Sequence, residues 1–135
     1  MMPEIIAHRG ASYLAPENTL TAFRKAMEIG ADGVEMDVQQ TGDKKLVIHH
    51  DFLIDWHTDM RGQIYDMTME ELKALDFGSW KDVSYKDEQI ATLQEALALC
   101  REMEGTVVQL ELKATINNDP DFVPRVIEEI RAADI

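Results

Sequence analysis

The feature that most constrains the fold of this chain is a charged pair near the end of each of three short apolar runs. The runs cover residues 5–9, 33–39 and 107–113, and each is rich in Val, Ile or Leu, as are strands covered on both faces. Ionised side chains are rarely placed in such runs unless they are paired or bind a metal. Acids, bases and cations projected together from strand ends are typical of the mouth of a parallel barrel, where chemistry is done.

One of the three pairs is basic, one is acidic and one joins an acid to a base. They are His8 with Arg9, Glu35 with Asp37, and Glu111 with Lys113. Residues two apart in a strand point to the same side, so Glu35 and Asp37 face together. These two acids could also form a buried, ion-paired couple without a metal, but two acids on one face repel each other unless a cation lies between them.

Helical segments separate the apolar runs. Apolar residues at helical spacing predict helices over about 16–30, from Thr68 onward, over 92–103 and over 120–133. Thr68 and Thr92 each begin a capping box. This alternation favours parallel strands with crossover helices. The polar, irregular residues 51–91 indicate an insertion carried on the barrel mouth.

A further extended run, 46–50, follows the second run after a turn at residues 42–45. A hairpin with arms of similar length predicts that His50 returns beside Asp37. His49 points to the opposite face, so a shift of one residue would exchange the two histidines.

Composition limits the partners and the location of the protein. The chain has 135 residues, enough for one domain, and a formal net charge of −13. That charge disfavours nucleic acid and anionic membranes and suits a divalent cation, although most of the acids are expected on a solvated surface. The single cysteine, Cys100, is expected to be a buried structural thiol. No secretion signal or membrane-spanning run is visible, which predicts a cytoplasmic location.

Several stretches together resemble the glycerophosphodiester phosphodiesterase family. They are HRGASYLAPENTLTAF at 8–23, GADGVEMDV at 30–38, LVIHHD at 46–51 and LELK at 110–113, with weaker matches at 67–80 and 91–97. The similarity follows the family's order over nearly the whole chain. A single motif such as His-Arg-Gly would be weak, but all of them in sequence leave little room for coincidence.

The resemblance implies a (β/α)8 barrel that hydrolyses glycerophosphodiesters to glycerol 3-phosphate and an alcohol with one divalent cation. The implied metal ligands are Glu35, Asp37 and Glu111; the implied general acid and base are His8 and His50; and the implied phosphate-binding residues are Arg9 and Lys113. His50 is favoured over His49 because Asp51 follows it, as in the family. Lys113 could also be no more than an ion-pair partner of Glu111, and His8 a satisfied core histidine.

The chemistry of a phosphodiester agrees with these residue types. Its cleavage needs charge neutralisation, a proton acceptor for the attacking hydroxyl and a proton donor for the leaving oxygen. Carboxylates suit a hard cation, Mg²⁺ or Ca²⁺, and a histidine pair can share the two proton tasks. The sequence leaves open the cation, the alcohol released, the acid and base assignment, and attack by water or by the substrate's own hydroxyl.

The chain departs from the family pattern away from the implied catalytic residues. The hairpin turn lacks the usual Asp-Gly, Ala91 replaces a usual Pro, and residues 55–58 read Asp-Trp-His-Thr where the family has Asp-Arg-Thr. His57 is expected to be a solvated residue of the insertion. Trp80 is expected to pack in a small core, while three other aromatic residues of the insertion are expected to shape a substrate cleft: Phe52, Trp56 and Tyr65.

Length is the largest departure, since a (β/α)8 barrel typically needs about 250 residues. We therefore expect residues 1–135 to be the N-terminal part of a single barrel domain and not a self-sufficient enzyme. An open half-barrel exposes a strand edge. This leaves two alternatives to the proposed activity, a related barrel phospholipase or sphingomyelinase-type phosphodiesterase, and a non-catalytic half-barrel module that forms a homodimer.

Overall fold

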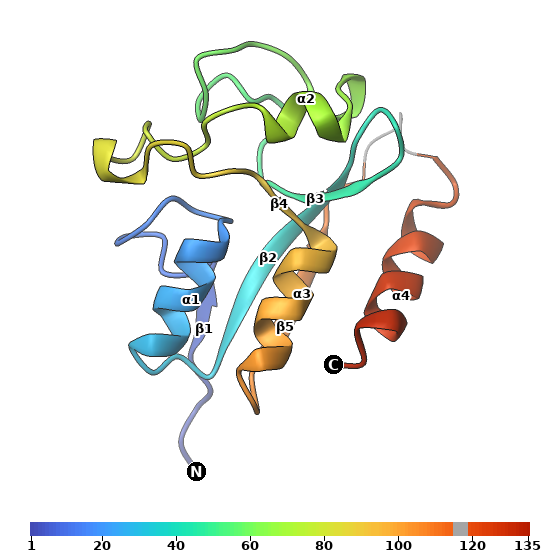
Figure 1. The fold of residues 1–135 in the computed structure, drawn as a ribbon. Helices are drawn as coiled ribbons and strands as arrows, with labels where there is room; N and C mark the ends of the chain where they lie inside the picture. The colour runs from blue at the N-terminus through green and yellow to red at the C-terminus, as the bar shows by residue number, and fades with distance from the viewer. Residues whose placement is uncertain (115–118) are drawn as a thin grey trace.

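A computed structural model describes residues 1–114 and 119–135 of the chain (Figure 1). The strands are β1 (Ile6–His8), β2 (Gly33–Gln40), β3 (Leu46–Ile48), β4 (Ala91–Thr92) and β5 (Val107–Leu112). The helices are α1 (Leu20–Glu28), α2 (Met69–Lys73), α3 (Leu93–Glu102) and α4 (Phe122–Ala133), with 3₁₀ turns η1 (Ile64–Asp66) and η2 (Val83–Tyr85). Every element expected from the sequence is present, with ends that differ by a few residues.

The largest of these differences is at α1, which was predicted to open at residue 16 and begins at Leu20. The preceding segment is a turn, in which Arg9 has a φ of 61°, Gly10 of 78° and Asn18 of 57°. A left-handed backbone cannot continue a right-handed helix. The Thr19 side chain then caps the helix by accepting a hydrogen bond from Ala22 N.

β2 is the centre of the sheet. It pairs in parallel with β1 on one side and β5 on the other. Its last residues continue into an antiparallel pairing with β3, which in turn pairs with β4 (Figure 1). Gly33 allows the close approach of β5, because a Cβ atom there would lie 2.2 Å from Val107 O. Parallel strands joined by helices confirm the α/β class, and the arrangement is that of part of a barrel.

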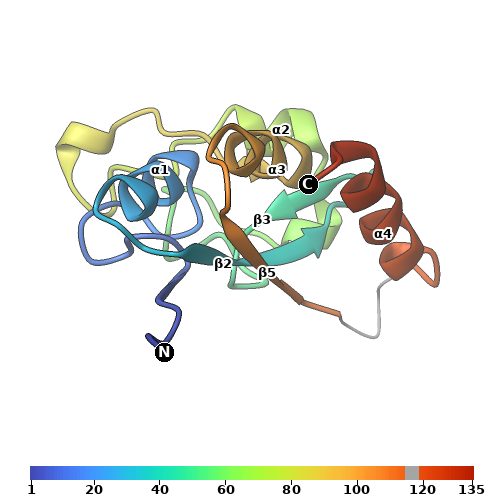
Figure 2. The same cartoon turned by 90° about the horizontal axis from the view of Figure 1, so that it is seen from below.

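The main core lies between the sheet and the helices. α1, α3 and α4 all lie on one side of the sheet (Figure 2). The side chains of β2 that face them, Val34, Met36 and Val38, are fully buried and pack in one cluster with residues such as Phe23 and Phe122. Cys100 belongs to this cluster, as predicted, and burial raises the pKa of its thiol to about 11.

Residues 51–91 build a second, smaller core above the sheet. It contains Ile54, Ile64, Leu72 and Phe77. Thr68 and Thr92 both form the predicted capping boxes, with Glu71 and Glu95. Two predictions for this segment are wrong. Trp80 is 39% exposed instead of packed in a core, although its indole Nε1 donates to Phe77 O at 2.8 Å, and His57 is only 8% exposed instead of solvated.

β5 is less covered than its apolar sequence suggests. Gln109 and Glu111 are exposed, and the apolar residues between them are partly buried. Within the described residues β5 pairs only with β2, so its outer edge has no partner strand. The strand therefore lies at the edge of the sheet, with its polar residues on the side away from the helices.

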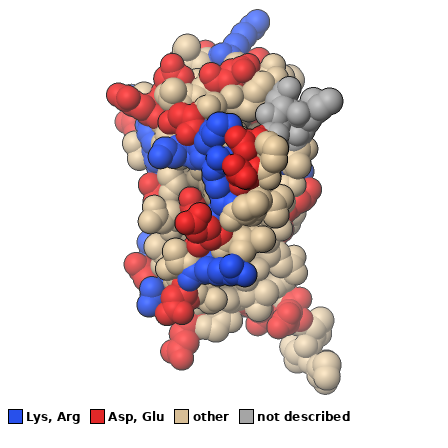
Figure 3. Space-filling view, turned by 90° about the vertical axis from the view of Figure 1, so that its right-hand side faces the viewer, with Lys and Arg blue, Asp and Glu red and all other residues tan. Residues whose placement is uncertain are grey.

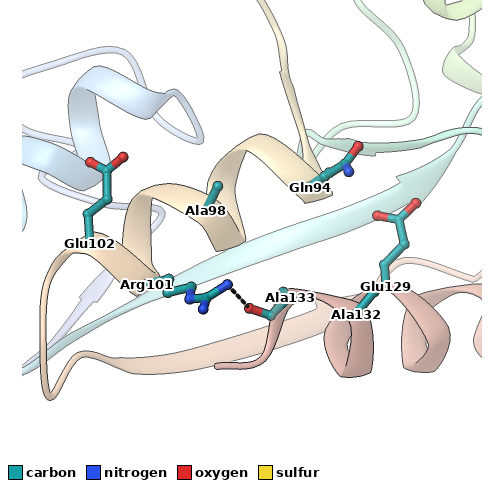
Figure 4. A pocket seen from close by; sticks show the side chains of 7 residues that line it. All are labelled: Gln94, Ala98, Arg101, Glu102, Glu129, Ala132 and Ala133. Atoms are coloured by element: carbon teal, nitrogen blue, oxygen red, sulfur yellow. Dashed lines mark hydrogen bonds between the residues drawn. The ribbon is translucent and has the colours of Figure 1, made fainter.

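A groove of about 600 Å³ separates α3 from α4 on the helical side of the sheet (Figure 4). Small side chains, Ala98 and Ala132, line it, and Arg101 Nη1 donates to Ala133 O across it at 3.4 Å. The groove lies on the side opposite the predicted site residues. It is therefore separate from the charged site described below.

The surface over α4 carries charged side chains of both signs. Basic and acidic side chains are interspersed on the face that carries this helix (Figure 3). Lys44 in the β2–β3 turn contacts Asp119, and Arg125 Nη2 lies 3.8 Å from the same carboxylate. No helix in the described part of the chain is long and apolar enough to cross a membrane.

Candidate active site

The strand register brings the three predicted metal ligands to one place. β2 pairs with β5 so that Asp37 lies opposite Glu111, and Glu35 lies two residues before Asp37 on the same side. One carboxylate oxygen from each acid lies within 4.8 Å of the others. The sequence suggested that Glu35 and Asp37 lie near the end of their strand. They lie within β2 instead, because the strand continues into the hairpin with β3.

Asp37 is fully buried and is held by residues from two other segments. Asn18 Nδ2 donates to Asp37 Oδ2 at 2.9 Å, while the backbone N of Asp37 donates to Asn18 Oδ1 at 3.3 Å. Arg9 Nε lies 3.6 Å from Oδ2, and Lys113 Nζ lies 3.7 Å from Oδ1. The turn before α1, which carries Arg9 and Asn18, and the end of β5 thus fix the Asp37 carboxylate in the middle of the site.

Three buried polar atoms around this carboxylate have no hydrogen-bond partner among residues 1–114 and 119–135. They are Glu35 Oε1, Asp37 Oδ1 and Arg9 Nε. Buried polar atoms nearly always have a partner. Two carboxylate oxygens without a donor fit a hard cation, and a guanidinium nitrogen without an acceptor fits an anion. The residues present therefore suit a divalent cation with a phosphate beside it.

The electrostatics of the acids differ with their surroundings. Burial, and then repulsion from Asp37, raises the pKa of Glu35 above its ordinary value. Glu111 is exposed, and the hydrogen bond from Lys113 Nζ to its Oε1 at 2.9 Å lowers its pKa. The same bond raises the pKa of Lys113. A cation at this site would favour the ionised form of Glu35 and remove its conflict with Asp37.

Arg9 is held in a conformation that few residues other than glycine adopt. Its φ is 61°, and such strain in a non-glycine residue often marks a functional position. Its backbone N donates to Glu35 Oε2 at 3.1 Å, and its Nη1 donates to Glu17 Oε2 at 2.8 Å. His8, the preceding residue, places its Nε2 atom 3.8 Å from Glu35 Oε2 and is largely exposed.

The hairpin places the two candidate histidines on different faces. The backbone N of His49 donates to Asp37 O at 2.9 Å, so the chain does return beside Asp37. His49 is buried, and desolvation lowers its pKa to about 4. His50 lines a cavity of about 420 Å³ together with Lys113 and Trp56, and its Nδ1 atom lies 2.8 Å from Asp51 Oδ1. His50 is therefore the histidine on the side of the charged site.

Sequence reasoning missed three residues next to this site. Glu17 and Asn18 hold Arg9 and Asp37, and His57 lies between Glu17 and Asp51. The first two belong to the HRGASYLAPENTLTAF stretch, so their place in a motif was the available signal. His57 carried none, because its burial depends on how the insertion folds.

The fold and the site together define a class of protein, part of an α/β barrel with acids and cationic side chains gathered on the face of the sheet away from the helices. The chain belongs to the glycerophosphoryl diester phosphodiesterase family, whose model matches residues 8–123. This confirms the family expected from the motifs.

Individual relatives agree with this assignment. The chain is 42% identical over 127 residues to a glycerophosphodiester phosphodiesterase of Caldanaerobacter subterraneus. The aligned region covers 94% of this chain and 52% of the relative. It is 35% identical to human glycerophosphodiester phosphodiesterase 1, over 96% of this chain and 45% of that protein. The chain thus spans about half the length of the curated relatives it matches.

A solved structure matches the fold closely. It is that of an Oleispira antarctica phosphodiesterase in complex with the product sn-glycerol-3-phosphate, with a TM-score of 0.91 and 40% identity over 96% of this chain and 52% of that chain. The barrel class predicted from the sequence is therefore confirmed for the portion that this chain covers.

Proposed function

We propose that this chain carries the catalytic residues of an enzyme that hydrolyses glycerophosphodiesters to glycerol 3-phosphate and an alcohol with one divalent cation. The observation that carries the proposal is the convergence of three carboxylates, two of them with buried oxygens lacking a partner, beside the unpartnered guanidinium nitrogen of Arg9. Family membership and the product bound in the Oleispira structure support the same reaction.

Glu35, Asp37 and Glu111 would hold the cation, Mg²⁺ or Ca²⁺. Bound there, it supplies charge neutralisation for a phosphate oxygen and for the developing negative charge. Asp37 is fixed by Asn18, so its free oxygen keeps its direction. Glu35 is fixed by the backbone N of Arg9 in the same way.

Arg9 and Lys113 would bind the phosphate. Arg9 offers a planar set of donors and Lys113 a point charge. Both already lie within 4 Å of Asp37, so an anion placed between them would also lie beside the cation. In this role Lys113 exchanges part of its contact with Glu111 for a phosphate oxygen.

His8 and His50 would transfer the protons. One removes the proton of the attacking hydroxyl, and the other donates a proton to the leaving oxygen, so that the P–O bond that breaks is replaced by the one that forms. Asp51 accepts at Nδ1 of His50, which leaves Nε2 to face the substrate. His8 lies opposite Glu35 in the pairing of β1 with β2.

The domain organisation proposed from the sequence completes this picture. Residues 1–135 form the N-terminal part of a single barrel domain, with an insertion over about 51–91. A second copy that pairs along the free edge of β5 stays a prediction.

The test is cation-dependent hydrolysis of glycerophosphocholine by the full-length enzyme that contains this chain, since residues 1–135 alone are expected not to be a self-sufficient enzyme. Activity is expected to disappear with a chelator, to return with Mg²⁺ or Ca²⁺, and to be lost in Glu35→Gln. Glu104→Gln, which changes an exposed acid far along the chain, is the matched control and should retain activity. Faster hydrolysis of a lysophospholipid or of sphingomyelin would assign the site to a related phosphodiesterase, and full activity in Glu35→Gln would contradict the proposed cation site.

A further inference from the structure

A buried histidine of the insertion, His57, lies outside the cation and phosphate site. Its side chain is 8% exposed. Two aromatic rings pack edge-on against it, with ring centroids 4.9 Å away for His49 and 4.6 Å away for Trp80. The imidazole therefore has a fixed place, and its nitrogens have fixed directions.

Each ring nitrogen of His57 faces a different carboxylate. Nε2 lies 3.6 Å from Glu17 Oε1, and Nδ1 lies 3.7 Å from Asp51 Oδ2. Nδ1 is buried without a hydrogen-bond partner, so Asp51 is the acceptor it faces. The neighbouring His57 ring, followed by the Arg9 guanidinium, lowers the pKa of Glu17 to about 2 despite its burial. These contacts place the ring between two carboxyl groups, those of Glu17 and Asp51.

The second oxygen of each carboxylate holds a residue of the proposed active site. Glu17 Oε2 accepts a hydrogen bond from Arg9 Nη1 at 2.8 Å. Asp51 Oδ1 lies 2.8 Å from His50 Nδ1. A continuous chain of contacts therefore runs from Arg9 to His50, with His57 at its centre. It joins the turn after β1 to the segment after β3.

We propose that His57 is a positioning residue that fixes Arg9 through Glu17 and His50 through Asp51. The inference rests on the proposed function for the roles of Arg9 and His50. A carboxylate bound through one oxygen only can rotate, and the His50 ring with it. Because His57 Nδ1 lies 3.7 Å from the second oxygen of Asp51, we expect the ring to restrict this rotation, so that the carboxylate stays aligned with Nδ1 of His50 and keeps the proton there.

The experiment observes the His50 ring directly and needs no turnover. Long-range ¹H–¹⁵N NMR spectra of the 135-residue chain at about pH 8, where an ordinary histidine is neutral, show which ring nitrogen carries the proton. The wild type is expected to hold the proton on Nδ1. His57→Phe keeps a buried ring but removes both nitrogens, and is expected to shift His50 toward the Nε2-protonated form. Trp80→Phe, which alters the other ring beside His57, is the matched control and should leave the wild-type form.

A second variant protects the test against misfolding of His57→Phe. Glu17→Gln removes the anion on the far side of His57 and is expected to shift the His50 tautomer in the same direction, to a smaller extent. A dispersed amide spectrum establishes that each variant is folded. A wild-type tautomer in both variants would overturn the positioning role, as would a wild type with the proton on Nε2.

A kinetic measurement separates this inference from the proposed function. In an active enzyme, His57→Phe is expected to lower kcat by about 10–100-fold, the usual cost of losing a residue that orients a catalytic group. A wild type without phosphodiesterase activity would contradict the proposed function while the NMR result stood. An active enzyme whose kcat and His50 tautomer are unchanged in His57→Phe would contradict the positioning role alone.

Discussion

The two faces of β2 differ in how they treat the polar atoms that they bury. On the helical face Val34, Met36 and Val38 are fully covered and leave nothing unpaired. On the opposite face Asp37 is equally buried, yet its Oδ1 atom and Glu35 Oε1 have no hydrogen-bond partner. The strand thus packs apolar side chains on one side and holds carboxylate oxygens without a hydrogen-bond partner on the other. These unpartnered oxygens are the reason that we propose a cation site on the second face.

The largest effects are expected on the charged face, in catalysis. In the full-length enzyme, His8→Ala and His50→Ala are each expected to lower the chemical step by about 10²–10⁴-fold, because each would remove a proposed proton-transfer group. Rates of glycerophosphocholine hydrolysis measure this. His49→Ala serves as the comparison, since His49 is buried behind the hairpin, and should lose much less. A greater loss at His49 than at His50 would show that the roles are exchanged.

The helical face is expected to respond in stability. Met36→Ala should lower the free energy of unfolding by about 2–5 kcal/mol, because it removes a fully buried side chain and leaves a cavity. Urea denaturation measures the change. A cost below about 1 kcal/mol would mean that this face is loosely packed, and the contrast between the two faces would fail.

Glu17 lies beside the proposed active site, and its charge also contributes to the stability of the fold. Its pKa is about 2 instead of 4.5, so its contribution is complete above about pH 4.5 and is lost as the pH falls toward 2. The upper limit of that contribution is about 3 kcal/mol. Glu17→Gln should therefore flatten the loss of stability between pH 4.5 and 2, as measured by urea denaturation at several pH values. An unchanged pH profile would contradict the contacts with Arg9 and His57.

The smallest expected effect is also the most specific. The pKa of Glu35 is raised, so its ionised form costs stability near neutral pH when no cation is bound. Glu35→Gln should melt at the same temperature as the wild type or slightly higher in the presence of a chelator. Added Ca²⁺ should raise the melting temperature of the wild type and leave this variant unchanged. A Ca²⁺-dependent shift of equal size in both proteins would place the cation elsewhere.

Particular residues show how far the sequence predicted this molecule. The strands, both capping boxes and the shared face of Glu35 and Asp37 follow from local patterns, which depend only on neighbours in the chain. The place of Glu111 beside them depends on the pairing of β5 with β2 and was implied only by the family resemblance. Asn18, Glu17 and His57 could not be found in this way. Their contacts depend on a left-handed turn and on the fold of the insertion, and both are set by residues far apart in the sequence. The burial of Trp80 and of His57 was predicted wrongly for the same reason, because burial in an irregular segment follows no periodic sequence pattern.

The central claim is that the unpartnered oxygens on the charged face of β2 bind a divalent cation. A crystal structure of the protein grown with Ca²⁺ tests it most directly. We expect one cation bound by Glu35, Asp37 and Glu111 at oxygen distances of about 2.3–2.6 Å. A cation bound elsewhere, or a site in which Lys113 remains against Asp37 and Glu111 with no cation at saturating Ca²⁺, would contradict it.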